Sequence, residues 1–463
     1  MSERVRNSDV TVTGELAAFI AASKTAPLPA DIRLLAKLHI LDTLASIVAC
    51  RDLEPSELAR KFALAHSGTC GAATILGTRQ SASLIDAVFA SAMTAHGAEI
   101  NDLIPSAFVQ PGPAIVSAAI ALAETRGGSG EDVLRAVVTG YELAGRMPKA
   151  LGIANLKKAN IANHGIGPVF GTAAAAASML GFTEDRIPHL LTFCAQQAAG
   201  SYQWLLDVEH IEKSFVFAGI GSRAGLQAAL FVEAGFRGMR DSLDHPSGWM
   251  RSSTFSGGDA DRAYLVDKLG ERFELEVTAY KRFPVGGPTQ PAVQGLLELL
   301  PKIRRDAVRS ILIEMPGRWQ AFRDAEMPAL NLRYLSSLIV LDGKLDFFMA
   351  QSRDRMLHDE AIRQFMSRVD VVHDPEQEHA PGTPRTESAR VTVTHEDGEQ
   401  VQIYVPYVVG FPSHPMPADE VRSKAFDLTH EALGAERAQR LIETVDKLES
   451  LENAAELVPL IAT

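Results

Sequence analysis

The stretch "NHGIGPVFGTAAAAASML", residues 163–180, places one histidine and several small residues ahead of an alanine run. Alanine is the strongest helix former, and side chains this small let helix axes approach closely. The stretch therefore predicts a buried helix inside a helical domain, with His164 at its entrance. Free N–H groups and the helix dipole favour an anion there, so His164 is a candidate site residue. A core or capping histidine is the alternative.

The size and charge of the chain limit its class. Its 463 residues exceed what one hydrophobic core usually serves, so two domains are expected. A net charge of -12 argues against nucleic acid as a partner. The N-terminal segment lacks an apolar signal core, and no apolar run of about 18 residues that could span a bilayer is expected. Cys50, Cys70 and Cys194 show no C-x-x-C spacing, which favours a reducing cytoplasm.

The periodicity of apolar residues changes along the chain. Helical spacing dominates up to about residue 270, and a strand-like stretch follows in "ERFELEVTAY" (271–280). The alternating segments "ARVTVTH" and "VQIYVPY", joined by "EDGE", indicate a β-hairpin. We expect a mainly α protein, with a large all-α helical domain (1–270, completed by C-terminal helices in 410–463) and a smaller α+β lid domain (271–409).

Polar residues follow an apolar helical stretch in "AHGAEINDLIPSAFVQPGP", residues 95–113. His96, Glu99 and Asp102 recur at three-residue steps and lead into a Pro/Gly loop. Loops at the end of rigid elements often line clefts, so the two carboxylates are candidate site residues. Solvated or capping residues are the alternative reading. As metal ligands, these three residues could make at most a weak, oxygen-rich site.

Basic residues mark two further segments. Lys213 precedes the apolar run "SFVFAGIG" (214–221), where partial burial would lower the pKa of its amine and suit it to act as a base. An ordinary surface lysine is the alternative. Lys281 and Arg282 lie beside the Pro/Gly loop "FPVGGP" (283–288), where they are candidate clamps for a substrate carboxylate.

The order of several blocks resembles the MmgE/PrpD family. These blocks are "LHILDTLASIVAC" (38–50), "NHGIGPVFGTAAAAASMLGFTEDRI" (163–187), "KSFVFAGIGSRAGLQAALFVEAGFRG" (213–238), "YKRFPVGGPTQPAV" (280–293) and "GFPSHPMPADEVRSKAFDL" (410–428). The resemblance covers about residues 15 to 450. It implies a helical domain, an α+β lid, a homodimer, a site between the two domains, and catalysis with no metal and no cofactor.

The resemblance also assigns individual residues. Glu99 and Asp102 match the first and last acidic positions of the family's D-x-D-D block, and His164, Lys213 and Tyr334 match its histidine, lysine and tyrosine positions. This chain has Gln110 and Gln290 where many members have histidines. Glutamine can hydrogen-bond a carboxylate but exchanges no proton near neutral pH. Gln110 and Gln290 are therefore expected to bind substrate, as is Arg146 through bidentate pairing.

The family includes 2-methylcitrate dehydratase, cis-aconitate decarboxylase and iminodisuccinate epimerase. The resemblance implies proton abstraction beside a carboxylate of a small di- or tricarboxylate, with Lys213 and His164 as base and acid. A cofactor-independent dehydratase, a lyase, is the first expectation. An epimerase that exchanges one proton between two bases is the second, and loss of the two histidines makes this scheme more credible. A non-catalytic carboxylate-binding protein is the third.

Overall fold

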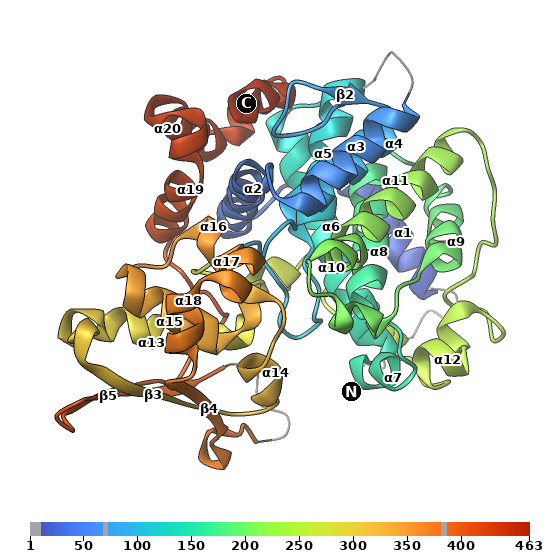
Figure 1. The fold of residues 1–463 in the computed structure, drawn as a ribbon. Helices are drawn as coiled ribbons and strands as arrows, with labels where there is room; N and C mark the ends of the chain where they lie inside the picture. Colours follow the sequence, from blue (N-terminus) through green and yellow to red (C-terminus); the bar gives the residue numbers. More distant parts are fainter. Residues whose placement is uncertain (1–10, 68–72, 381–386) are drawn as a thin grey trace.

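The computed structural model describes residues 11–67, 73–380 and 387–463, so Cys70 lies outside the described residues. Most of the described chain is helical, which confirms the mainly α class (Figure 1). The helices of the N-terminal part are α1 (Val12–Ala22), α2 (Ala30–Cys50), α3 (Glu54–His66), α4 (Leu84–Ala95), α5 (Gly112–Arg126), α6 (Gly130–Leu151), α7 (Ile153–Lys158), α8 (Asn163–Met179), α9 (Ile187–Gln197), α10 (Ile211–Ser214), α11 (Ile220–Glu233) and α12 (Ser253–Ser256).

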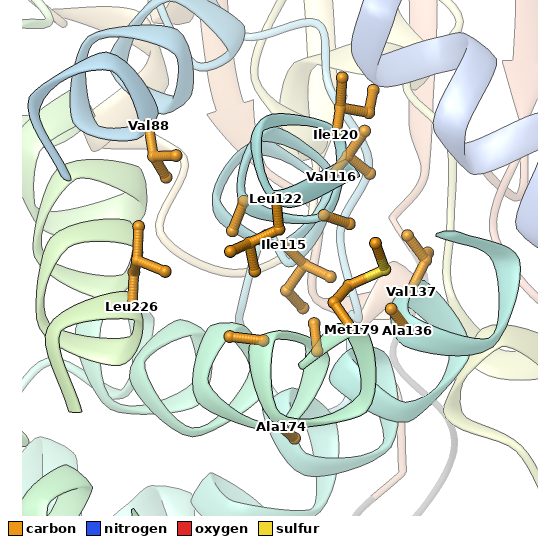
Figure 2. Packing of buried hydrophobic residues seen from close by; sticks show 14 of the residues in the cluster. Val88, Ile115, Val116, Ile120, Leu122, Ala136, Val137, Ala174, Met179 and Leu226 are labelled. Carbon is orange, nitrogen blue, oxygen red and sulfur yellow. The ribbon is translucent and has the colours of Figure 1, made fainter. Parts of the chain in front are cut away.

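Helix α8 is the buried helix that the alanine run predicts, and every one of its residues is buried. Helix α8 contacts α6 and α11 at glycine residues, because a larger side chain at these positions would collide with the backbone of the neighbouring helix. A Cβ atom on Gly171 would lie 2.7 Å from the carbonyl oxygen of Gly140, and one on Gly225 would lie 2.5 Å from that of Val169. Apolar side chains from α4, α5, α6, α8 and α11 fill the space between these helices (Figure 2).

The second part of the chain forms its own core around a mixed sheet. Its helices are α13 (Gln290–Leu299), α14 (Gln320–Arg323), α15 (Leu332–Asp342), α16 (Phe347–Gln351), α17 (Arg353–His358) and α18 (Glu360–Met366); its strands are β3 (Val308–Met315), β4 (Val369–His373), β5 (Ala389–His395) and β6 (Gln400–Val405). The strand order is β4-β3-β5-β6, with β3 parallel to β4 and the other pairs antiparallel. Helices α13, α15 and α18 lie on one side of this sheet (Figure 1). The predicted hairpin is confirmed as β5 and β6.

The C-terminal helices α19 (Ala418–Leu433), α20 (Ala435–Asp446) and α21 (Leu457–Ile461) return to the N-terminal part, and α19 lies along α2 (Figure 1). Their residues Ala425, Leu441 and Ile461 belong to the first hydrophobic core, whereas the second core draws on residues between Val285 and Val393. The domain limits at 270 and 409, and any lid movement, stay predictions.

Three sequence-based expectations need correction. The strand-like stretch 271–280 forms a 3₁₀ turn over Glu274–Val277 instead of a strand. The Glu276 carboxylate accepts from the Phe273 N–H and holds this turn. The stretch contributes a single β-bridge, between Ala279 and Leu103. A short hairpin, β1 (Ala73–Thr74) with β2 (Ser81–Ala82), interrupts the otherwise helical N-terminal part. Among the described residues, one helical span, Ile211–Glu233, is long and apolar enough to cross a membrane, but 67% of its apolar window is buried inside the fold.

Candidate active site

Three buried side chains surround the buried carboxylate of Glu99. We call these four residues the Glu99 cluster: Glu99, His210, Lys213 and Lys281. The Lys213 ammonium donates to Glu99 Oε1, and the Lys281 Nζ lies 3.3 Å from Glu99 Oε2. His210 Nε2 lies 3.3 Å from Glu99 Oε1. The cluster therefore concentrates two ammonium groups and an imidazole on a single carboxylate.

Short irregular segments hold these residues in place. Helix α4 ends at Ala95, and Glu99 lies in the turn that follows. Lys213 belongs to the short helix α10, which continues through a π-helical segment, Phe215–Gly219, into α11. Such π-helical segments occur frequently at functional sites. Lys281 arrives from the loop after the 3₁₀ turn and also donates to the carbonyl oxygen of Asn101 at 3.1 Å.

Electrostatics keep the Glu99 carboxylate charged. Burial by itself raises the pKa of Glu99, but Lys213 and then Lys281 oppose this effect, and the resulting pKa lies well below its usual value. Burial is also the largest effect on Lys281, whose pKa is lowered despite the attraction of Glu99. A charged carboxylate thus faces two cations in a site almost without water contact.

Aromatic rings connect His164 with this cluster. His164 lies in the first turn of α8 rather than in a turn before it. Its ring stacks on Phe217 with centroids 4.1 Å apart and meets Trp204 edge-on at 4.9 Å. The Lys213 ammonium lies 5.4 Å from the centroid of Phe217 and 5.3 Å from that of Trp204. The structure therefore brings His164 and Lys213 to the same two rings.

Asp102 turns away from Glu99, although only three residues separate them. Its Oδ2 accepts the Tyr141 hydroxyl at 2.5 Å, and its Oδ1 accepts the N–H of Gly112, the first residue of α5, at 3.2 Å. His39 Nδ1 lies 3.1 Å from Asp102 Oδ2. These contacts hold the start of α5, and the structure does not bring Asp102 into the Glu99 cluster.

Arg146 is also kept apart from the cluster. Its fully buried guanidinium pairs with Glu142 through Nε at 2.8 Å. The remaining nitrogens donate to the carbonyl oxygens of Tyr264, Asp267 and Arg272. This hydrogen bonding ties α6 to the segment before the second unit. In this conformation Arg146 has a structural position and not that of a substrate clamp, because its donors already have protein acceptors.

Two further expected site residues, Gln290 and Tyr334, lie elsewhere as well. Gln290 bonds the backbone of Phe283 and Val285 and so fixes the Pro/Gly loop. The hydroxyl of Tyr334, in the second core, donates to the Met349 carbonyl oxygen at 2.6 Å. Gln110 is buried just before α5, and its Oε1 has no hydrogen-bond partner among the described residues.

Two cavities adjoin the turn that carries Glu99. One, of about 420 Å³, we call the cleft: it lies between the two units and is lined by Gly97 and His210 on one side and by Pro328, Gln351 and Arg353, among others, on the other. The second, of about 640 Å³, lies beside α2 and α19 and contains Arg282. Of the Glu99 cluster, His210 is the member that lines the cleft.

A metal ion fits the cluster poorly. His96, Glu99 and His210 each offer one ligand atom, and these atoms lie within 4.8 Å of one another, in a combination that zinc sites use. Both Glu99 oxygens, however, already face the ammonium groups of Lys213 and Lys281. A divalent cation placed there would meet two positive charges, so we assign no metal to these residues.

His96 and His210 are the residues that the assignment of roles from sequence missed. His96 stood out by its spacing from Glu99, but its place beside the cluster depends on the turn after α4. His210 precedes Lys213 by three residues, and no periodic pattern marks it. Its backbone adopts a left-handed conformation with φ 64° and ψ 15°, which the sequence did not signal.

The helical fold and the buried carboxylate–ammonium cluster beside a cleft define a class of mainly α, two-part proteins with a buried charged site. The chain belongs to the MmgE/PrpD family: residues 14–262 match the MmgE/PrpD N-terminal domain, and residues 283–450 match the MmgE/PrpD C-terminal domain. This confirms the resemblance seen in the sequence.

One relative is the cis-aconitate decarboxylase-like protein oryM of Aspergillus oryzae, which is 25% identical over 97% of both chains. The cis-aconitate decarboxylases of Mus musculus and Homo sapiens are each 21% identical to this chain. Each alignment spans 81% of this chain, and it spans 78% of the mouse protein and 79% of the human protein. Together these findings support an enzyme of this family.

Proposed function

We propose that this protein is a cofactor-independent lyase that acts on a small di- or tricarboxylate. The observation that carries the proposal is the convergence of the buried ammonium groups of Lys213 and Lys281 on one carboxylate. Buried cations of this kind suit recognition of a substrate carboxylate. They also suit stabilisation of the enediolate-like charge that forms when a neighbouring carbon loses a proton or CO₂.

Three residues have proposed roles in this reaction. Lys213 and Lys281 hold the substrate carboxylate and the developing charge, and His164 acts on a proton from its position beside Phe217. Sequence reasoning gave Lys213 the role of base. Its ammonium donates to Glu99 in the resting protein, which favours an electrostatic role first. A homodimer in the cytoplasm also remains part of the proposal.

Two lyase reactions and one isomerisation are consistent with this site. Loss of water from a hydroxy acid is the reaction expected from the sequence, and the names of the relatives make loss of CO₂ an equally direct candidate. Inversion at one carbon is the alternative. It requires two proton-exchanging groups, and the shared contacts of Lys213 and His164 with Phe217 and Trp204 supply such a pair.

One experiment separates these reactions. The purified protein is incubated with cis-aconitate, citrate or malate in deuterated water and followed by NMR, with a Lys213→Met protein as control for contaminating enzymes. Release of CO₂ supports a decarboxylase, an alkene product from citrate or malate supports a dehydratase, and deuterium in recovered, inverted substrate supports an epimerase. No turnover of any substrate would contradict the proposal and favour a binding protein.

A further inference from the structure

His210 occupies an unusual position for a buried histidine. It is the one histidine of the described residues with a positive φ, and the turn before α10 holds it there. Asp207 fixes this turn, because its carboxylate accepts the N–H groups of Glu209 and Lys213 at 2.9 and 2.8 Å. Residues held in sparsely populated backbone conformations cluster at active sites, where surrounding structure fixes them.

The hydrogen bonds around His210 are compatible with a proton on Nδ1 of its ring. Ser214 Oγ lies 2.7 Å from the carbonyl oxygen of His96 and 2.6 Å from that of His210, and we assign its single proton to one of these acceptors. The same Oγ is therefore free to accept from His210 Nδ1, 3.0 Å away. In the neutral ring Nδ1 then carries the proton, and Nε2 keeps its lone pair.

The lone pair on Nε2 faces a partner that favours its protonation. Glu99 Oε1 is a carboxylate oxygen 3.3 Å from Nε2, so two acceptors face each other while the ring is neutral. Uptake of a proton at Nε2 removes this conflict and creates an ion pair. His210 thus combines a proton-accepting nitrogen with a carboxylate that stabilises the product of that step, beside the cleft that it lines.

We propose that His210 is a proton-exchanging catalytic residue of this site, in addition to His164, with Nε2 as the acting atom. This inference rests on the proposed function. In the step, a C–H bond next to a substrate carboxylate breaks, its proton moves to Nε2, and its electron pair remains on the substrate as an enediolate that Lys213 and Lys281 stabilise. The imidazolium then gives the proton to the leaving hydroxide, which departs as water, or returns it to the carbon; a decarboxylation breaks no C–H bond, so this step belongs to the dehydration and to proton exchange at one carbon. In this way His210 supplies the kind of imidazole that positions 110 and 290 lack.

The charged surroundings set the pH range in which His210 acts. Burial is the largest effect on His210 and lowers the pKa of its ring. Glu99 and Asp207 oppose this effect, and Lys213 adds to it. The ring is therefore neutral near pH 7, as a base must be. The titratable groups around it are Glu99 and His96 after α4, Asp207, Glu209 and Lys213 around α10, and, along the cleft, Glu54, Arg353, Asp354 and His358.

Chemical rescue tests the proposal. His210→Gly suits the positive φ and leaves room for free imidazole. With citrate or malate, whichever the wild type turns over, we expect kcat/KM to fall by about 10²- to 10⁴-fold. Added imidazole should restore it by about tenfold or more. In the wild type, kcat/KM should fall as the pH drops through a value below 6.5. This loss of activity at low pH should be absent in the variant. His66→Asn, an exposed histidine on α3, is the matched control.

Different failures have different meanings. A folded His210→Gly protein with the wild-type rate would overturn the role of His210 alone, and so would a slower one that imidazole cannot restore and that loses activity at low pH as the wild type does. A wild type that only decarboxylates cis-aconitate also overturns this inference alone, whereas one that turns over none of the three acids overturns the proposed function and this inference with it. If His210→Gly does not fold, His210→Asn gives the same test through the pH profile, because asparagine tolerates a positive φ.

Discussion

Lys424 of α19 donates a 2.6 Å hydrogen bond to Asp42 of α2, and the two residues lie 382 positions apart in the chain. The same ammonium donates at 2.8 Å to the carbonyl oxygen of Ile100, beside Glu99. Lys281 bonds the next carbonyl oxygen, that of Asn101. Two lysines from the C-terminal half thus hold the backbone of the turn that carries the cluster's carboxylate.

The first prediction concerns this buried pair. Lys424→Met leaves the Asp42 carboxylate buried without its cation, and removal of one partner of such a pair typically costs about 3–5 kcal/mol in the free energy of unfolding. Chemical denaturation measures this loss. Lys344→Met, at a largely exposed lysine, should change stability by less than about 0.5 kcal/mol. Equal stability of the Lys424→Met and wild-type proteins would show that the pair contributes nothing.

The fold was more accessible from sequence than the arrangement of the site. Alanine and glycine in α8 dictate close helix packing, and alternation in β5 and β6 dictates a hairpin, because both signals are local. Glu99 and Asp102 are three residues apart and were both expected in the site, but the chain leaves helical geometry after Ala95 and the two carboxylates diverge. Local spacing carries no information about such a turn.

Charged residues were harder to place for a related reason. Lys281 and Arg282 are neighbours with the same charge, yet Lys281 is buried against Glu99 and Arg282 is exposed beside the second cavity. Arg146 resembles a substrate clamp in sequence, but apart from Glu142, four positions before it, its acceptors are carbonyl oxygens more than one hundred positions away. The partner of a charge is decided by tertiary contacts, which one sequence does not display.

The second prediction follows from the pair of Glu142 and Arg146. Burial raises the pKa of Glu142 to about 7; Arg146 opposes this shift, and Glu274 adds to it. A carboxyl group with a higher pKa in the folded state stabilises the fold at pH below its unfolded value, and this contribution is lost as the pH rises through about 7.

We therefore expect the free energy of unfolding of the wild type, relative to Glu142→Gln, to fall by about 3 kcal/mol between about pH 4.5 and about pH 8. Denaturant titrations at a series of pH values measure this difference. Glu436→Gln, at an exposed carboxylate on α20, should run parallel to the wild type. Parallel curves for Glu142→Gln as well would mean that Glu142 titrates normally.

The third prediction concerns Lys213 and His164, which share contacts with Phe217 and Trp204. Lys213→Met should lower kcat by about 10²- to 10³-fold through lost charge stabilisation, and His164→Asn should cause a comparable loss. If the two residues serve one step, the double variant should be little worse than the poorer single variant. Lys157→Met, an exposed lysine, is the control. Fully multiplicative losses would mean that they act independently.

The fourth prediction is that activity survives metal removal. His96, Glu99 and His210 have the donor atoms for a divalent cation, but Lys213 and Lys281 already neutralise Glu99, and binding a cation would displace both ammonium groups. Exhaustive dialysis against EDTA should therefore leave kcat unchanged, and elemental analysis should find less than one metal ion per chain in the active protein. Loss of activity on chelation, followed by recovery with one particular divalent ion, would instead make this trio a metal site and assign Lys213 a different partner in the working enzyme.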